Sequence, residues 1–389
     1  MKIILTGFMG SGKTEVSKKL SSILNLPLIE LDELTLKLSG RKNISEIFAI
    51  DGEEKFREFE SQTFKNIVEV DAVISAGGGT KVESGKIIYL RTSFPVISDR
   101  LNVKTDRPLF NNEARKLYEK RIPKYEKSAD IIIDTDLLSI DEVAEEIIRN
   151  LNVCMIIGDP VSYSLSPKMH NAAYEALNLD FVYFAKKVTS EDLKNVPDFI
   201  RKFGIKGVSV TAPHKIEIMK FLDEIDENAR KIGAVNTILN KDGKICGYNT
   251  DVDAISDLLK NHRGKKIAIL GDGGMAKAME YAARNFKIFS RKSGNFDSED
   301  LTNFEIIMNA TPIGMNPDET PVPKKYLRKG QIVFDAVYSS EETRLIREAK
   351  SFGAETVNGK EILLKQGMAQ FKLFTGHDAP EKIMRKSIT

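Results

Sequence analysis

Residues 2–14 read Lys2-Ile3-Ile4-Leu5-Thr6-Gly7-Phe8-Met9-Gly10-Ser11-Gly12-Lys13-Thr14. The apolar run at the start is typical of a buried strand, and the segment after it fits the pattern G-x-x-x-x-G-K-[ST]. Glycines in such a loop let successive backbone N–H groups surround phosphates at a helix N-terminus, whose dipole favours anions. Lys13 can then reach the β- and γ-phosphates, and the Thr14 hydroxyl can bind Mg²⁺. The stretch therefore predicts an α/β unit with a P-loop that binds ATP through Gly10, Ser11, Gly12, Lys13 and Thr14.

Short β-rich runs alternate with amphipathic helical stretches from this loop to residue 389. Strand-like runs lie at residues 2–6, 72–75, 87–90, 131–134, 153–157, 266–270 and 332–335. Such alternation is typical of α/β folds with parallel sheets. A chain of 389 residues is long enough for two or more cores. We expect a first boundary at 150–152, after a helix at 141–150, and a second near 261–264.

Composition narrows the class of protein. Hydrophobic residues make up 41% and charged residues 29%, as in soluble globular proteins. The net charge of +2 gives no electrostatic reason to expect nucleic acid or an anionic membrane as a partner. No apolar run approaches the roughly 20 residues that cross a bilayer. Cys154 and Cys246 are too few for a disulfide scaffold, which indicates buried thiols in a reducing cytoplasm. The sequence does not define an oligomeric state.

Charged and glycine residues follow the P-loop along the first unit. Glu30 and Asp32 lie at the end of a strand-like run at 28–32, on the same side by alternation. Gly77-Gly78-Gly79 follows the run at 72–75, where the backbone must approach a ligand closely. Arginine forks suit carboxylates and phosphates. Several arginines near one P-loop therefore suggest a small anionic acceptor, and the candidates are Arg57, Arg100, Arg107 and Arg121.

Taken together, residues 1–150 resemble shikimate kinase over their whole length. The resemblance is carried by the P-loop, Asp32, 51–57, 77–79, 107–109, and Arg121 ahead of Pro123 and Tyr125. It implies that Asp32 holds the shikimate hydroxyls while Arg57 and Arg121 clamp its carboxylate, with backbone donors from Gly78 and Gly79.

The resemblance also assigns the phosphoryl-transfer groups. Arg107, on a mobile lid, would stabilise the transferring phosphoryl group, and Arg100 would stack on adenine. Catalysis would then rest on Lys13, Asp32 and Arg107. Glu30 stands where the family usually has Asp, and its longer arm can still reach Mg²⁺ through a water. The segment between Arg107 and Arg121 is short for a lid.

The second half contains three small polar segments. In the first, at 161–167, Ser166 is a credible N-cap with Pro167 at the first helical position. A strand at 208–211 enters 212–215, which we interpret as the start of a helix. A lysine there, Lys215, works against the helix dipole and so suggests a function. Asp251 closes a turn-rich segment at 247–251.

From 153 to about 380 these segments resemble shikimate dehydrogenase. The family places Lys215 and Asp251 side by side at the carbonyl being reduced, where they assist proton transfer. The resemblance implies substrate contacts from Ser164, Ser166, Thr211, Asn236, Tyr338 and Gln366. It makes 309–315 a wall of the cofactor cleft and leaves His214 structural. It also implies a substrate domain at 153–260, completed by C-terminal helices at about 360–389, and a compact Rossmann domain at 263–358.

A cofactor loop lies at 269–276, between a predicted strand and a helix. An NAD site expects an acidic residue about 20 positions further on. Instead the next strand ends Phe289-Ser290-Arg291-Lys292, which suits a 2′-phosphate and favours NADP(H). Asp272 replaces a small residue and would repel the pyrophosphate unless it faces solvent. The expected cofactor contacts are Gly271, Asp272, Gly273, Gly274, Met275, Ser290, Arg291, Lys292, Ala336 and Gly359.

The resemblances together imply a bifunctional enzyme of the shikimate pathway. One half would reduce 3-dehydroshikimate to shikimate with NADPH, and the other would phosphorylate shikimate at its 3-hydroxyl with ATP and Mg²⁺. Two alternatives stay open at this point. One is a quinate or shikimate dehydrogenase that prefers NAD, fused to a kinase. The other is a nucleotide and metabolite sensor without turnover, which would not need Lys13, Asp32, Lys215 and Asp251 together.

Overall fold

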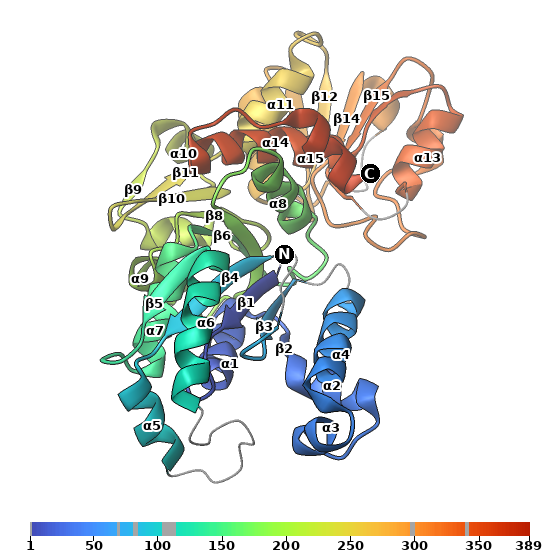
Figure 1. Cartoon of the computed structure of the whole chain (residues 1–389). Helices are drawn as coiled ribbons and strands as arrows, with labels where there is room; N and C mark the ends of the chain where they lie inside the picture. Colours follow the sequence, from blue (N-terminus) through green and yellow to red (C-terminus); the bar gives the residue numbers. More distant parts are fainter. Residues whose placement is uncertain (1, 68–70, 81–84, 103–113, 296–299, 339–341) are drawn as a thin grey trace. The chain divides into compact units, whose positions relative to one another are not determined.

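A computed structural model describes residues 2–67, 71–80, 85–102, 114–295, 300–338 and 342–389 (Figure 1). The chain divides into two compact units with a boundary between Leu151 and Asn152. The first contains one sheet and the second contains two.

Unit 1 is built on a sheet of five parallel strands in the order β2-β3-β1-β4-β5. Their bounds are β1 Lys2–Thr6, β2 Leu28–Glu30, β3 Ala72–Ser75, β4 Lys86–Arg91 and β5 Ile131–Asp134. The central strand β1 is apolar because both faces are covered, and Ile3, Ile4 and Leu5 are fully buried. All carboxyl ends of a parallel sheet lie at one edge, so the loops after β1, β2 and β3 meet there.

The helices of unit 1 are α1 Lys13–Leu24, α2 Leu31–Ser39, α3 Ile44–Ile50, α4 Gly52–Asn66, α5 Phe94–Asn102, α6 Ala114–Ser128 and α7 Ile140–Asn150. Figure 1 shows α2, α3 and α4 grouped together beside the sheet. The predicted strand at 28–32 is too long, because α2 begins at Leu31. Asp32 therefore lies in the first turn of a helix, where a carboxylate suits the dipole, and not on the strand face of Glu30. The predicted helix at 141–150 begins one residue earlier, with Ser139 and Glu142 forming a capping box.

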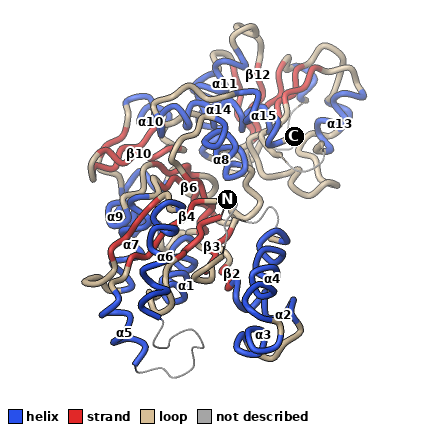
Figure 2. The backbone as a smooth tube through the Cα atoms, in the orientation of Figure 1, coloured by secondary structure: helices blue, strands red, loops and turns tan. Residues whose placement is uncertain are grey.

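Unit 2 begins with a mixed six-stranded sheet in the order β7-β6-β8-β10-β11-β9. Its strands are β6 Val153–Gly158, β7 Val182–Lys187, β8 Gly207–Val210, β9 Glu224–Ile225, β10 Thr237–Lys241 and β11 Lys244–Tyr248. A second sheet of five parallel strands follows in the order β13-β12-β14-β15-β16. These are β12 Ile267–Leu270, β13 Phe286–Phe289, β14 Ile306–Asn309, β15 Ile332–Asp335 and β16 Glu355–Val357. Figure 2 shows β6 and β10 in one group of strands and β12 in another.

The second sheet of unit 2 has the doubly wound order in which the first strand lies between the second and the third. Ligands bind such sheets outside the carboxyl ends of the strands, where the winding reverses direction. Here that point lies between β12 and β14. The loops that follow these two strands are therefore the expected walls of a cofactor site.

The helices of unit 2 are α8 Ser166–Ala176, α9 Val196–Phe203, α10 Glu227–Ile232, α11 Asp251–Leu259, α12 Gly274–Ala282, α13 Arg344–Ser351, α14 Gly359–Thr375 and α15 Glu381–Ile388. Helix α14 belongs to both cores of the unit. Its residue Ile362 packs in the cluster beneath the parallel sheet, whereas Leu364 and Phe371 pack in the cluster beneath the mixed sheet. A side chain between these positions therefore lies at the junction of the two cores.

Two local predictions for unit 2 are wrong. Ser166 is the first residue of α8, and Leu165 takes the N-cap position. No helix starts at 212–215: this segment is a turn, and only a 3₁₀ helix, Glu217–Phe221, follows it. Lys215 therefore lies in a turn after β8. Its side chain is placed by its neighbours there and not by a helix.

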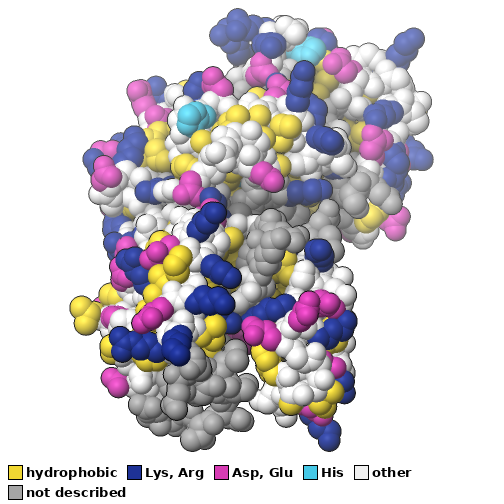
Figure 3. Space-filling view, in the orientation of Figure 1, with side chains coloured by type: hydrophobic (Ala, Val, Ile, Leu, Met, Phe, Trp, Pro, Cys, Tyr) yellow, Lys and Arg dark blue, Asp and Glu magenta, His cyan; other side chains and the backbone are white. Residues whose placement is uncertain are grey.

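Surface features add little to these assignments. Among the described residues, no helix is long and apolar enough to span a bilayer. The described part of the chain also contains no group of three or more metal-ligating side chains. On the face drawn in Figure 3, basic and acidic side chains are interspersed. Cys154 and Cys246 are both buried and free.

Candidate active sites

A cavity of about 560 Å³ lies in unit 2 at the carboxyl ends of β8, β12 and β14. Its walls come from both sheets and from α14. Of the predicted substrate contacts, those lining it are Ser166, Thr211, Lys215, Asn236, Asp251, Tyr338 and Gln366. Of the predicted cofactor contacts, those lining it are Gly271, Asp272, Gly273, Gly274, Met275, Ser290, Arg291, Ala336 and Gly359. One cavity therefore brings the two predicted sets together.

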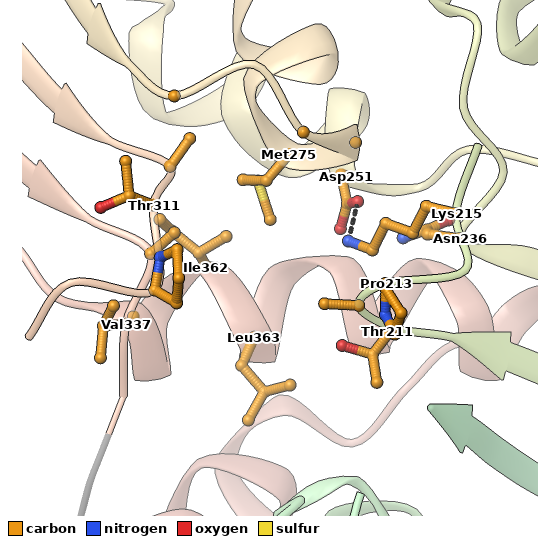
Figure 4. A pocket seen from close by; sticks show the side chains of 18 of the residues that line it. Thr211, Pro213, Lys215, Asn236, Asp251, Met275, Thr311, Val337, Ile362 and Leu363 are labelled. Carbon is orange, nitrogen blue, oxygen red and sulfur yellow. Dashed lines mark hydrogen bonds and ion pairs between the residues drawn. The ribbon is translucent and has the colours of Figure 1, made fainter. Parts of the chain in front are cut away.

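An ion pair stands inside this cavity. Lys215 Nζ donates to Asp251 Oδ2 at 2.6 Å, and Figure 4 shows the two side chains facing each other. Their side chains are only 14% and 2% exposed, so the pair is shielded from solvent. Asp251 opens α11, where the helix dipole favours a carboxylate. The arrangement holds an ammonium group beside a carboxylate at the wall of the cavity.

The position of Lys215 depends on close contact with the cofactor loop. Its backbone carbonyl accepts from Val235 N at 2.7 Å. On the other side, a Cβ placed on Gly274 would lie 2.7 Å from the Lys215 Cβ. Only glycine at 274 lets the start of α12 approach the lysine this closely. The cofactor loop and the ion pair are therefore in direct contact.

Polar groups of the substrate domain cover the wall beside Lys215. Asn236 is 1% exposed, and its Nδ2 donates to Thr250 Oγ1 at 2.9 Å and towards Gln366 Oε1 at 3.4 Å. Ser164 does not line the cavity, but its side chain hydrogen-bonds to Tyr338. Burial raises the pKa of Tyr338 to about 12, so its phenol stays protonated and can donate. The wall offers neutral donors and acceptors, as recognition of hydroxyl groups requires.

The parallel sheet supplies the other wall of the cavity. Gly271, with φ of +115°, lies against Ala310 and Thr311 of the loop after β14. A Cβ on Gly359 would lie 2.4 Å from the Val337 carbonyl oxygen. These close approaches leave a narrow backbone-lined slot. It fits an elongated dinucleotide, whose pyrophosphate would lie at the N-terminus of α12.

A basic residue, Arg291, lies at the end of the slot where the adenosine ribose of the cofactor would bind. Ser290 and Arg291 line the cavity, whereas Lys292 is exposed and does not. Asp272 is exposed, so its carboxylate has access to solvent. The residues present thus fit NADP(H), with Arg291 available to the 2′-phosphate.

Buried polar residues hold the loops of this wall. The Asp335 carboxylate accepts from Thr343 Oγ1 at 2.6 Å, from Asn309 Nδ2 at 2.9 Å and from Val337 N at 3.1 Å. Burial raises the pKa of Asp335 above its ordinary value of 3.8. Asn309 Nδ2 also donates to the Ile313 carbonyl at 3.0 Å. The pair fixes the loops after β14 and β15 that border the slot.

Sequence reasoning missed three buried residues of the substrate wall, Tyr183, Ser209 and Gln370. Ser209 and Gln370 line the cavity, and Ser209 Oγ donates to Gln370 Oε1 at 2.8 Å. Gln370 lies four residues after Gln366 on α14, so both amides share one face of that helix. Two glutamines at that spacing, in a chain with few of them, were a signal available in the sequence.

In unit 1, a cavity of about 1090 Å³ lies at the carboxyl edge of the sheet. The predicted residues that line it are Gly10, Ser11, Gly12, Lys13, Thr14, Glu30, Asp32, Arg57, Gly78, Arg100 and Arg121. Arg107 lies outside the described residues, as does the predicted lid up to residue 113.

The P-loop has the geometry that phosphate binding requires. Lys13 Nζ donates to the carbonyls of Gly7 and Phe8 at 2.9 and 3.0 Å, which curls the loop around the ammonium. Gly7, Gly10 and Gly12 all have positive φ, which other residues rarely adopt. Arg100 donates to the Gly10 carbonyl at 3.4 Å and so borders the loop.

Two buried oxygens indicate where ATP and Mg²⁺ would fit. Ser11 Oγ and Glu30 Oε1 have no hydrogen-bond partner among the described residues, although both are buried. Burial raises the pKa of Glu30 above 4.5. Orphaned buried acceptors are rare in folded proteins. An incoming ion with its bound waters would satisfy them, so the residues fit a Mg²⁺-bound nucleotide, which Thr14 and Glu30 would hold.

Two arginines, Arg57 and Arg121, line the part of this cavity where the phosphoryl acceptor is predicted to bind. Arg57 donates to the buried Glu60 and, at 3.1 Å, to Glu53 Oε1. A Cβ on Gly79 would lie 2.6 Å from Arg57 Cζ, so this glycine makes room for the guanidinium although it does not line the cavity. Arg121 lies near Gly78, and Tyr125 donates to the Gly78 carbonyl. Glu60, with Thr80 donating to it at 2.7 Å, is a further residue that sequence reasoning missed.

The geometry defines a P-loop phosphotransferase unit followed by a nicotinamide-dependent dehydrogenase unit. Family models agree in each part. "Shikimate kinase" matches residues 9–152, "Shikimate dehydrogenase substrate binding domain" matches 156–238, and "Shikimate 5'-dehydrogenase C-terminal domain" matches 359–389. The chain belongs to the shikimate dehydrogenase family and carries a shikimate kinase domain ahead of it.

Individual relatives match unit 2. "Shikimate dehydrogenase (NADP(+))" of Methanococcus maripaludis is 38% identical over 264 residues, covering 60% of this chain and 94% of that protein. The protein of the same name from Methanocaldococcus jannaschii is 41% identical over 266 residues, with the same coverage. A crystal structure of the Thermus thermophilus enzyme with NADP(H) and shikimate is 30% identical, with a TM-score of 0.56, covering 61% of this chain and 98% of that one.

Proposed function

We propose that this chain catalyses two successive steps of the shikimate pathway. Unit 2 reduces 3-dehydroshikimate to shikimate with NADPH, and unit 1 phosphorylates the 3-hydroxyl of shikimate with ATP and Mg²⁺. The observation that carries the proposal is the presence of two such cavities on one chain. One holds a Lys–Asp ion pair beside a dinucleotide slot, and the other holds a P-loop facing an arginine pair.

In unit 2, NADPH supplies a hydride to the carbonyl carbon when it is bound. The ammonium of Lys215 lies at the wall of the cavity where the carbonyl group would be reduced. It donates the proton that the carbonyl oxygen takes up. Asp251 orients Lys215 Nζ and balances its charge. Asn236, Gln366, Thr211 and Ser166 hold the hydroxyls and carboxylate, with Ser164 acting through Tyr338. Gly271 packs closely against Ala310 and Thr311 at the wall of the proposed cofactor site.

In unit 1, Mg·ATP supplies the phosphoryl group when it is bound. Backbone N–H groups of Gly10 to Thr14 and the Lys13 ammonium stabilise charge on the phosphates. Asp32, close to Gly77, accepts the proton of the shikimate hydroxyl or holds it by hydrogen bonding. Arg57 and Arg121 bind the carboxylate, and Arg107 completes the site from the lid.

We place these functions in domains at 1–150, 153–260 with about 360–389, and 263–358. Small molecules are the only substrates proposed, with no nucleic-acid or membrane partner. The interspersed basic and acidic side chains on the face in Figure 3 support this. The free, buried cysteines favour a cytoplasmic location.

Two separate assays test the proposal on the purified chain. In the first, shikimate oxidation is followed by absorbance with NADP or NAD. In the second, shikimate-dependent ADP release is followed with Mg·ATP. Both activities are expected, with higher catalytic efficiency for NADP and for shikimate over quinate. Absence of either activity contradicts the bifunctional proposal, and preference for quinate and NAD supports the alternative dehydrogenase. Ligand binding without any turnover would support the sensor hypothesis.

A further inference from the structure

A continuous chain of buried hydrogen bonds runs behind the substrate wall of unit 2. The Tyr183 hydroxyl donates to Ser209 Oγ at 2.6 Å, and Ser209 Oγ donates to Gln370 Oε1 at 2.8 Å. Gln370 Nε2 then donates to the Asn236 carbonyl at 3.2 Å and to Thr237 Oγ1 at 3.0 Å. The chain therefore connects β7, β8, α14 and β10, and it ends at a residue of the proposed substrate site.

Every member of this chain is shielded from solvent. Tyr183 is fully buried, Ser209 is 3% exposed and Gln370 is 1% exposed. The Tyr183 ring is stacked on the His170 ring, with centroids 4.4 Å apart and planes 6° from parallel. Polar groups buried this deeply are strongly destabilising without partners. This series of hydrogen bonds therefore has one fixed arrangement, unlike the exchangeable hydrogen bonds of exposed side chains.

The partners determine which way each amide points. The backbone carbonyl of Asn236 can only accept a hydrogen bond. Gln370 must therefore present its Nε2 to that carbonyl and its Oε1 to Ser209. Thr237 Oγ1 donates to Asn236 Oδ1 at 2.8 Å, and Thr250 N donates to the same oxygen at 2.8 Å. These two hydrogen bonds hold the side-chain oxygen of Asn236, Oδ1, on the side of Thr237 and Thr250. Its Nδ2 group donates to Thr250 Oγ1 at 2.9 Å and, on the cavity side, towards Gln366 Oε1 at 3.4 Å.

We propose that Tyr183, Ser209 and Gln370 are positioning residues that fix Asn236 as a hydrogen-bond donor in the substrate site. The inference rests on the proposed dehydrogenase function of unit 2 and adds three residues to it. Asn236 lies beside Lys215 at one side of the cavity in Figure 4. The Tyr183 hydroxyl also interacts with the Ser166 side chain, so the same chain reaches a second proposed substrate contact. The substrate hydroxyls and carboxylate are thus recognised by groups whose orientation is set before binding.

The main test replaces Gln370 by methionine, which has a similar shape and no comparable donor. The KM for shikimate should rise about 10- to 100-fold, because Asn236 loses its fixed orientation. The KM for NADP should stay within about 2-fold and kcat within about 3-fold, since the ion pair and the slot are untouched. A merely structural role would lower the melting temperature and reduce the active fraction without this selective change in KM. An unchanged KM for shikimate in folded protein overturns the proposal.

Tyr183→Phe provides a milder variant should Gln370→Met fail to fold, because it keeps the ring and its stacking. It should raise the KM for shikimate about 3- to 10-fold. The matched control is Tyr174→Phe, the same change at a tyrosine 1% exposed in the same core, whose hydroxyl faces Cys154 and takes no part in the chain. The control should leave the KM for shikimate unchanged. Equal effects of the two variants contradict a positioning role.

A double-mutant cycle tests whether the residues act as one chain. In the Ser209→Ala background the Tyr183 hydroxyl loses its route to Gln370 and keeps only its contact with Ser166, so Tyr183→Phe should then raise the KM by less than it does in the wild-type protein. Independent effects that multiply would overturn the proposed chain. If the wild-type chain shows no dehydrogenase turnover, the proposed function fails. Shikimate binding by calorimetry on the same variants then decides the positioning role separately.

Discussion

Both units place a glycine-rich loop directly after the first strand of a parallel sheet, at Gly7 and at Gly271, yet they use it differently. In unit 1 the loop closes around its own lysine, and further cations, Arg57 and Arg121, complete the site. In unit 2 the glycine loop itself contains no lysine. Its residue Gly274 instead packs against Lys215, which lies in the turn after β8. A phosphoryl group carries several charges, whereas a carbonyl under reduction needs one proton and a dry slot.

The difference extends to the surrounding side chains. The proposed substrate contacts of unit 1 include charged groups that are partly exposed, such as Arg57 at 26%. Those of unit 2 are neutral amides and hydroxyls around one ion pair. Ser166, Asn236 and Gln366 are buried, and Ser164, Thr211 and Tyr338 are half-buried. We expect unit 1 to respond to changes of charge and unit 2 to respond to changes of shape and orientation. The predictions below test this contrast, beginning with the largest effect.

Removing the ammonium of unit 2 should have the largest effect. Lys215→Ala is expected to lower dehydrogenase kcat about 10²- to 10⁴-fold, because the proton donor at the carbonyl is lost. Kinase kcat should stay within about 2-fold, since Lys215 belongs to the other compact unit. Steady-state assays of both activities on one preparation measure this. A parallel loss of kinase activity would contradict independent sites.

Asp32→Ala is the counterpart in unit 1. Asp32 lies in the first turn of α2 and lines the unit 1 cavity. We expect kinase kcat to fall about 10²-fold or more when the group that holds the reacting hydroxyl is removed. Dehydrogenase kinetics should not change. Unaltered phosphorylation in this variant would show that another group takes the proton.

Adding one methyl group at Gly274 should disturb the contact between the cofactor loop and the ion pair. Its Cβ would lie 2.7 Å from Lys215 Cβ, so the lysine or the loop must move. We expect dehydrogenase kcat to fall about 10- to 100-fold, as displacements of this kind cause. The comparison is Gly273→Ala, whose Cβ meets nothing within 4 Å and whose effect should be clearly smaller. Similar losses in the two variants would locate the sensitivity in the loop alone.

Cofactor choice should depend on Arg291. Arg291→Ala is expected to lower the ratio of kcat/KM for NADPH over NADH about 10-fold, because a charge-assisted contact to the 2′-phosphate is lost. Lys292→Ala serves as the neighbour control, since Lys292 lies outside the cavity lining. A ratio that falls only with Lys292→Ala would move the phosphate contact to that residue.

The smallest effect concerns the pH dependence of stability in unit 1. Burial raises the pKa of Glu60 above its ordinary value of 4.5. Between 4.5 and the raised value the folded chain binds more protons than the unfolded chain, so the free energy of unfolding contributed by Glu60 falls as pH rises through this window. Above the raised value the contribution is constant.

Urea unfolding at several pH values measures this dependence, and Glu60→Gln should remove it. Glu53→Gln is the matched control, because Glu53 binds the same arginine from the exposed side. A slope that persists in Glu60→Gln would assign the effect to another carboxyl group.

The sequence was most informative where chemistry is encoded locally. The P-loop and the second glycine loop each lie between a strand and a helix, and the strands predicted at 2–6, 72–75, 131–134 and 332–335 have the observed bounds. Local rules failed at Asp32 and Lys215. Alternation predicts a strand that continues past Glu30, where α2 begins instead. The segment 212–215 predicts a helix start, but the packing of Lys215 against Gly274 and Val235 keeps a turn there.

The buried amide chain was beyond local reasoning for a different reason. Ser209 and Gln370 are 161 residues apart, and only the packing of α14 against β8 and β10 brings them together. A serine in a strand and a glutamine in a helix have no individual signature. Their role depends on the partners that the tertiary fold supplies.

A single coupled assay tests whether one chain carries out both steps in succession. Purified protein is given 3-dehydroshikimate and NADPH, NADPH loss is followed by absorbance, and Mg·ATP is then added while products are identified by mass spectrometry. The account predicts NADPH consumption equal to the shikimate formed, followed by conversion of that shikimate to shikimate 3-phosphate. NADPH consumption without any phosphorylated product, or no consumption at all, would contradict it.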